Sequence, residues 1–210
     1  MTPAVGSHAT LKQLDEATRR LVMLASIITG GNDRQIRDAV TRAATDIPAM
    51  WVEELVLQSY LFAGFPRALN AMREWRRVSP EPLAGTSPAD VDRWRADGEA
   101  TCAAVYGSMY ERLRENIREL HPSLDEWMII EGYGKVLSRP GLDLPRRELC
   151  IVAACAAAGQ DRQLLSHFHG ALNVGVDPSV IDLVIDALSE FLGAERAASA
   201  RMLWARVRGK

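Results

Sequence analysis

The chain has 210 residues, of which 48% are hydrophobic and 25% are charged, and these values are typical of a globular protein rather than a disordered one. Its 25 Lys and Arg residues nearly balance its 27 Asp and Glu residues, and the net charge of −2 argues against a generally basic nucleic-acid-binding protein. No apolar run approaches the roughly 18 residues that cross a membrane, and the first residues lack the pattern of a signal peptide. Three cysteines, an odd number, suit a reducing compartment. We therefore expect a cytoplasmic protein that binds neither membranes nor nucleic acids.

Residues 1–80 are predicted to form helices, with Gly30-Gly31 as the first break between them. Runs of β-branched residues bounded by turn residues are scarce, so a β-sheet has little support. Residues 80–87 are rich in proline, glycine and small polar residues, which is typical of a linker.

One long amphipathic helix is expected next, capped by Ser87-Pro88 and ended by His121-Pro122. Another helix follows, because Ser123 and Glu126 have the spacing of a capping box. It ends before Pro140, since proline disfavours helical backbone at the residue that precedes it. The expected apolar stripes are Val91, Trp94, Cys102, Val105, Met109, Leu113 and Leu120 in the long helix, and Trp127, Ile130 and Val136 in the other.

Four helices are predicted in the C-terminal part. The first is rich in alanine and stops at Gly159, and the second runs from about Asp161 to Val174. Asp177-Pro178 caps and starts the third, and the fourth follows Gly193. The fold class is therefore all-α, with about ten helices.

An internal repeat relates the two ends of the chain. Residues 14–21 recur as 142–149 and residues 31–36 recur as 159–164, both at an offset of 128. We predict a tandem duplication with a degenerate copy at 1–80, a linker and connecting helix at 81–122, and a second copy at 123–210. After one inserted residue, the offset of 129 pairs Phe62 with Phe191, Gly64 with Gly193, Arg67 with Arg196 and Trp75 with Trp204.

Glu148 and His167 are the candidate acid–base pair. If two helices fold back at Gly159, the two residues lie about 16 and 12 Å from the turn, within side-chain reach. A carboxylate beside an imidazole in a partly buried groove can move protons near neutral pH. The structural alternative is a glutamate placed favourably near a helix start and a histidine satisfied by a neighbour. Arg20 and Ala39 occupy the equivalent positions of the first copy, so only the second copy can carry the pair.

Weaker signals accompany this pair. The glycines around Tyr133 indicate either close helix packing or a ligand beside the tyrosine. His169 points about 200° away from His167 on a helix, so a metal site formed by the two is not expected. Residues 60–66 could form an aromatic helix end or the wall of an apolar pocket. Cys150 and Cys155 have neither zinc nor dithiol spacing, and buried thiols are expected.

Residues 133–142, 147–149 and 167–176 together resemble the carboxymuconolactone decarboxylase family. In the first copy, residues 53–55 and 60–66 are similar to the ending of the same family's domain. The resemblance implies an all-helical fold that assembles into trimers or hexamers. A duplicated chain is then expected to form a homo-oligomer of fewer chains, such as a trimer or a dimer.

The family has two chemistries. The alkylhydroperoxidase D branch places a C-x-x-C pair between the glutamate and the histidine, but the matching positions here are Gln160 and Gln163. Glutamine is no thiolate nucleophile. The sequence is more similar to the decarboxylase branch, which needs no metal or organic cofactor.

The resemblance thus implies a cofactor-free lyase or isomerase that acts on a small carboxylated lactone or a related acid. His167 would transfer the proton, Glu148 would orient it, and Arg139 would hold the substrate carboxylate. The alternatives are a peroxidase that uses Cys150 or Cys155, and a non-enzymatic helical oligomer or small-ligand binder. The other expected substrate contacts are Tyr133, His169 and Phe65.

Overall fold

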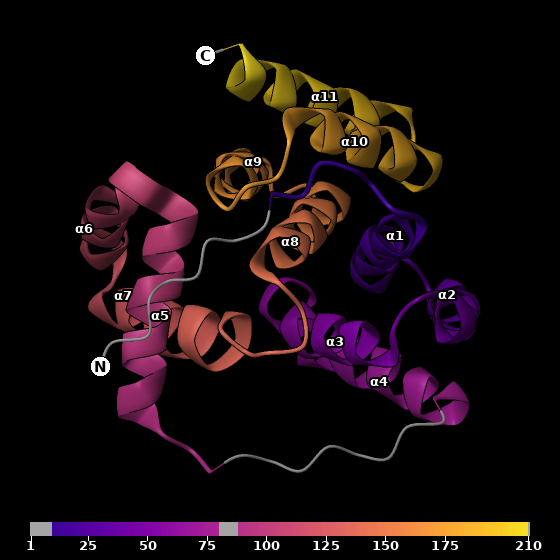
Figure 1. Ribbon diagram of the computed structural model, residues 1–210, viewed down its shortest axis with the longest axis horizontal. Coiled ribbons are helices and arrows are strands. Elements are labelled where there is room, and N and C mark those ends of the chain that lie inside the picture. The colour runs from indigo at the N-terminus through magenta and orange to yellow at the C-terminus, as the bar shows by residue number, and fades with distance from the viewer. Residues whose placement is uncertain (1–9, 80–87, 210) are drawn as a thin grey trace.

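The computed structural model describes residues 10–79 and 88–209 (Figure 1). The expected linker at 80–87, including the expected cap Ser87, lies outside the described residues. Within the described ranges the fold is all-α, as predicted, and the extended pairing there is an isolated bridge between Leu11 and Val176. No helix in those ranges is both long and apolar enough to cross a membrane.

The first half contains four helices. Asp15 caps the first, since its side chain accepts the backbone N–H of Thr18, and Asn32 and Gln35 form a capping box at the second. Gly64, with φ of +82°, permits the sharp turn into the fourth. The helices are α1 (Glu16–Gly30), α2 (Asp33–Asp46), α3 (Ala49–Ala63) and α4 (Phe65–Val78).

The second half has the same order of helices. Asp143 caps the first, left-handed Gly159 ends it, and Asp177 caps the third, so the predicted breaks at Gly159 and Asp177 are confirmed. Gly193, with φ of +76°, turns the chain into the last helix, as Gly64 does in the first half. The helices are α8 (Leu144–Ala158), α9 (Asp161–Asn173), α10 (Pro178–Leu192) and α11 (Ala194–Arg208).

The two halves also share side-chain contacts. The indole N–H of Trp75 donates to Glu53, and that of Trp204 donates to Asp182. Each pair is separated by 22 residues. The predicted repeat thus has a counterpart in the structure, while its origin by duplication stays a prediction.

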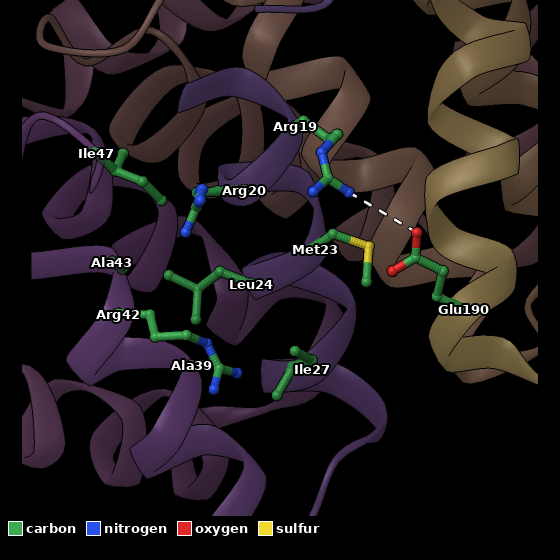
Figure 2. A pocket seen from close by; sticks show the side chains of 10 residues that line it. All are labelled: Arg19, Arg20, Met23, Leu24, Ile27, Ala39, Arg42, Ala43, Ile47 and Glu190. Atoms are coloured by element: carbon green, nitrogen blue, oxygen red, sulfur yellow. Dashed lines mark ion pairs between the residues drawn. The ribbon is translucent and has the colours of Figure 1, made fainter. Parts of the chain in front are cut away.

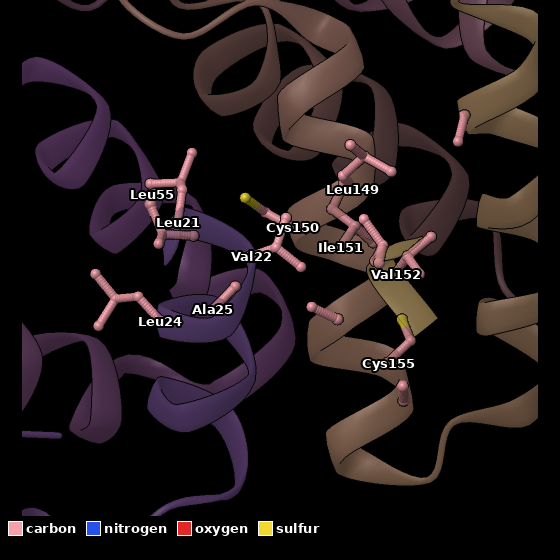
Figure 3. Packing of buried hydrophobic residues seen from close by; sticks show 14 of the residues in the cluster. Leu21, Val22, Leu24, Ala25, Leu55, Leu149, Cys150, Ile151, Val152 and Cys155 are labelled. Atoms are coloured by element: carbon pink, nitrogen blue, oxygen red, sulfur yellow. The ribbon is translucent and has the colours of Figure 1, made fainter. Parts of the chain in front are cut away.

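The core lies between the halves, where α1 packs against α8 (Figures 1 and 3). Leu149, Ile151, Val152 and Ala153 of α8 have no exposed surface. The small side chains of the alanine-rich α8 allow other helices to approach it from several sides. α8 therefore forms the centre of the molecule.

The chain between the halves folds back on itself, and we call residues 91–137 the arm. The expected single long helix is wrong, because Gly107, with φ of +54°, breaks it. Of the expected stripe, Cys102 and Val105 are buried, whereas Val91, Met109 and Leu120 are exposed. The arm consists of α5 (Val91–Tyr106), the short 3₁₀-helix η1 (Gly107–Met109), α6 (Tyr110–Leu120), α7 (Pro122–Trp127) and the π-helix η2 (Met128–Leu137).

Two further expectations for the arm are also wrong. The cap of α7 is His121, whose Nδ1 accepts the backbone N–H of Ser123, so Ser123 is not a cap itself. The wider turns of η2 shift its buried face away from the 3.6-residue pattern. The buried apolar residues of η2 are Ile129, Tyr133, Val136 and Leu137, so of the expected stripe Val136 is buried and Ile130 is only partly buried. Trp127, the last residue of α7, precedes η2 and is 61% exposed.

Glycines explain how closely η2 packs against α5. A Cβ at Gly134 would lie 1.9 Å from the carbonyl oxygen of Trp94, and a Cβ at Gly98 would lie 2.1 Å from that of Ile129. Close packing therefore accounts for Gly134. A Cβ at Gly132 would meet nothing within 4 Å, so packing does not explain that glycine.

Candidate active site

Glu148 and His167 are in contact. Glu148 Oε2 lies 2.8 Å from His167 Nδ1, so the predicted proximity of the two side chains is confirmed. The glutamate has no exposed surface and the histidine is 6% exposed. The left-handed turn at Gly159 folds α9 back along α8 and brings the two residues to the same level.

Gly170 provides the space for this carboxylate. A Cβ at position 170 would lie 2.6 Å from Glu148 Oε2 and 2.8 Å from Cγ1 of Val105. Any side chain at this position would therefore displace the carboxylate or separate α9 from α5. The absence of a side chain on α9 lets the arm cover the acid–base pair.

The second oxygen of the carboxylate has an unusual environment. Glu148 Oε1 is buried and has no hydrogen-bond partner among the described residues. An unpartnered buried carboxylate oxygen is costly, because it loses the hydrogen bonds that water provides. Such an atom favours a functional role over a purely structural one.

Two phenols and two thiols surround Glu148. The rings of Tyr106 and Tyr133 meet edge-on with centroids 6.2 Å apart, and burial raises the pKa of both hydroxyls. Burial also raises the pKa of Cys102 and of Cys155 to about 12, and the nearby negative charge of Glu148 acts in the same direction. All four groups are therefore neutral near pH 7.

A cavity of about 530 Å³ lies beside this cluster, between α9 and the arm. Tyr106 and Val105 line the cavity and also face the Glu148 side, so they form the wall between the cavity and the pair. His169 lies on α9 and lines the cavity, whereas His167 does not. The two histidines thus face different surroundings, as their helical spacing predicts. The remaining lining residues are Ser108, Met109, Leu113, Asn116, Ser166 and Asn173.

Residues 122–206 match the sequence model of the carboxymuconolactone decarboxylase family. This segment belongs to that family. It begins close to the expected boundary at 123 and contains both Glu148 and His167.

Two fungal relatives are similar to part of the chain. One is "Peroxisomal protein 2" of Schizosaccharomyces pombe, which is 30% identical over 129 residues, covering 59% of this chain and 60% of the relative. The other is "Peroxisomal protein 2" of Saccharomyces cerevisiae, which is 22% identical over 160 residues, covering 62% of this chain and 56% of the relative. The chain thus spans less than two thirds of the length of these relatives.

Arg139, the expected ligand of the substrate carboxylate, is already engaged. Its Nε and Nη2 donate to the carboxylate of Glu54 at 2.9 to 3.1 Å. Arg147, which has no exposed surface, donates to the same carboxylate at 2.8 Å and to Gln58 at 3.0 Å. Arg139, whose side chain is 42% exposed, thus belongs to an ion-pair network with the buried Glu54 of α3 and the buried Arg147. This network was not predicted, because Glu54 and Arg139 are 85 residues apart.

The aromatic side chains around the pair also differ from the expectation. Phe65 is 59% exposed and stacks on Tyr60, with ring centroids 4.6 Å apart. The ring that contacts His167 is that of Phe62, edge-on at 6.0 Å. Phe62 belongs to the stretch 60–66 that the sequence offers as a possible pocket wall, although Phe65 is the residue expected to contact the substrate. Tyr133 lies in the buried cluster around Glu148, close to its expected place.

The thiols are poorly suited to peroxide chemistry. Cys102, Cys150 and Cys155 are free and buried. Burial raises the pKa of Cys150 as well, so none of the three thiols is ionised near pH 7. A peroxidase needs an accessible thiolate. The environment of the cysteines thus argues against the peroxidase alternative.

Proposed function

We propose that this chain is a cofactor-free acid–base enzyme that decarboxylates or isomerises a small carboxylated lactone or a related acid. The observation that carries the proposal is the buried Glu148–His167 contact with its unpartnered carboxylate oxygen. An ionised Glu148 accepts the Nδ1–H of His167, which leaves Nε2 as the nitrogen that takes up or delivers the proton.

The chemical step follows from these roles. The carbon–carbon bond to the substrate carboxylate breaks, carbon dioxide leaves, and the electron pair passes into the unsaturated lactone. The imidazolium of His167 delivers one proton to carbon, and solvent returns it to the imidazole. Glu148 stabilises the imidazolium through its negative charge. Acid–base catalysis of this kind contributes about 10²–10⁴-fold to the rate.

The cavity of about 530 Å³ is the proposed substrate entrance. It is within the size range of small-molecule sites, about 300–1,000 Å³. Because Tyr106 separates the cavity from the pair, a substrate that displaces this ring reaches His167. His169, on the cavity wall, is the proposed contact of the substrate carboxylate in place of Arg139.

Two variants test the proposal with a carboxylated muconolactone as the probe and released carbon dioxide as the readout. His167→Gln is expected to lower kcat by about 10²–10⁴-fold without changing the helical circular dichroism spectrum. Glu148→Gln should lower it less, because the imidazole remains. The control His121→Asn keeps a capping acceptor on the surface and should retain full activity.

Two outcomes would contradict the proposal. Full turnover by His167→Gln would remove the pair from the mechanism. A wild-type protein that releases no carbon dioxide from the probe would remove the decarboxylase assignment.

Assembly and location also remain proposals. The exposed Leu120, Leu124 and Trp127, where α6 meets α7, form the surface that a homo-oligomer would cover. Sedimentation of the wild type and of Trp127→Glu tests this surface, because the charge should dissociate the oligomer.

The names of the fungal relatives favour a peroxisome over the predicted cytoplasm. A fluorescent fusion distinguishes the two locations.

A further inference from the structure

An open cleft of about 220 Å³ lies between α1 and α2, in the first half of the chain (Figure 2). At the repeat offset of 128 it occupies the place that the acid–base pair has in the second half. Arg20 takes the position of Glu148, and Ala39 takes that of His167. The side chain of Arg20 is 40% exposed, so solvent reaches this cleft, whereas Glu148 is fully buried.

The lining of the cleft combines positive charge with apolar surface. Its charged lining groups are Arg19, Arg20, Arg42 and Glu190 of α10, and two acids outside the lining, Glu16 and Asp46, pair with Arg20. Figure 2 shows Arg20 and Arg42 reaching into the cleft with Leu24 between them in this view, and the ion pair of Arg19 with Glu190 at one side. The apolar lining residues are Met23, Leu24, Ile27, Ala39, Ala43 and Ile47.

Neighbouring acids hold Arg20 in place but leave it a free donor. Its Nε donates to Glu16 at 2.7 Å and its Nη1 donates to Asp46. Among the described residues its Nη2 makes no hydrogen bond, and no acid lies within ion-pair distance of Arg42. Two guanidinium groups thus offer donors to a ligand in the cleft.

We propose that this cleft binds a small carboxylic acid with an apolar body. A guanidinium matches the two oxygens of a carboxylate, and the apolar lining would cover the hydrocarbon part of the ligand. The volume of about 220 Å³ restricts the ligand to a small molecule. This site is separate from the proposed catalytic pair and does not depend on its chemistry.

Calorimetric titration of the full chain with hexanoate tests the proposal. Arg42→Gln is expected to weaken hexanoate binding about tenfold, the effect of losing one charged hydrogen bond. Arg34→Gln is the matched control, because Arg34 lies on the same helix with a side chain that is 89% exposed, outside the cleft. It should bind hexanoate as the wild type does. Both arginines are exposed, so both variants are expected to fold.

Three further measurements locate the ligand and define its chemistry. Hexylammonium, with the same tail and the opposite charge, should not bind. Inorganic phosphate should bind more weakly than hexanoate, because it cannot use the apolar lining. His167→Gln should leave hexanoate affinity unchanged, which separates this cleft from the catalytic pair.

The proposal is overturned if Arg42→Gln binds hexanoate as tightly as Arg34→Gln does. Equal affinity for hexylammonium, or for phosphate, would also overturn it. Loss of hexanoate binding in His167→Gln, with Arg42→Gln unaffected, would place the ligand in the second half instead.

Discussion

Replacing Gly170 by alanine tests the packing around the acid–base pair most directly. The new Cβ would lie 2.6 Å from Glu148 Oε2 and 2.8 Å from the Val105 methyl group, so the carboxylate has to move. Overpacking costs about 1–3 kcal/mol, and the lost charged hydrogen bond costs about 1.5–3 kcal/mol. Alanine returns about 1 kcal/mol through its higher helix propensity. We therefore expect Gly170→Ala to lower the unfolding free energy by about 1.5–5 kcal/mol.

Gly132→Ala is the matched control for this prediction. It adds the same methyl group where nothing lies within 4 Å, so only the propensity term of up to about 1 kcal/mol acts and stability should not fall. Urea denaturation followed by tryptophan fluorescence measures both variants. The ¹⁵N signals of the His167 imidazole, recorded by NMR, report whether Nδ1 still bears the hydrogen-bonded proton. If Gly170→Ala is as stable as Gly132→Ala and keeps the imidazole signals of the wild type, the steric reasoning is wrong.

The remaining predictions concern charge and thiols. Arg147→Met should lower the free energy of unfolding by about 3–5 kcal/mol, because the buried carboxylate of Glu54 loses the positive charge of its buried partner. The double variant Glu54→Leu/Arg147→Met should then be more stable than Arg147→Met in thermal unfolding; a less stable double variant would contradict this. The three cysteines should not react with a disulfide reagent at pH 8 until urea is added. A pKa of about 12 leaves roughly one thiol in 10⁴ ionised at Cys102 and Cys155. Rapid reaction of the folded protein with the reagent would contradict the burial of the thiols. Hydrogen bonds from Arg114 lower the pKa of Asp125 below 3.8, so the ionised carboxylate stabilises the folded state. This contribution to the unfolding free energy is complete above pH 3.8 and is lost as the pH falls through the lowered pKa. The deficit of Asp125→Asn, about 1–3 kcal/mol at pH 7, should therefore shrink in acid, and a deficit unchanged at pH 2.5 would contradict this assignment.

Local sequence signals predicted the parts of the site that depend on one helical hairpin. Glycine at 159 and the rise of an α-helix were sufficient to bring Glu148 near His167, because both lie within about twenty residues of each other. The same reasoning could not find the partner of Arg139. Glu54 is distant in the chain, and nothing local distinguishes a guanidinium held by a buried acid from one that is available to a substrate.

The arm shows a second limit of sequence patterns. Gly107 stands inside a stretch with helical periodicity, and one glycine in such a stretch is often tolerated, so the break was not expected. The stripe of η2 was misplaced because a 3.6-residue period was applied to a π-helix. Tyr133 of η2 lies buried in the cluster around Glu148, whereas Trp127, the last residue of α7, precedes the π-helix and is exposed.

One position accounts for much of the difference between the two halves. In the second half, Gly170 lets Val105 of the arm come close to the carboxylate, and a Cβ alone would prevent that approach. In the first half, the equivalent position is Arg42. The side chain of Arg42 leaves no room for a residue to pack against the helix as Val105 packs at Gly170. Its charge also favours contact with water. A shared helical scaffold thus gives a buried glutamate–histidine pair on one side and an open cleft lined by arginines on the other. Exchanging glycine and arginine between the two positions is expected to impair both.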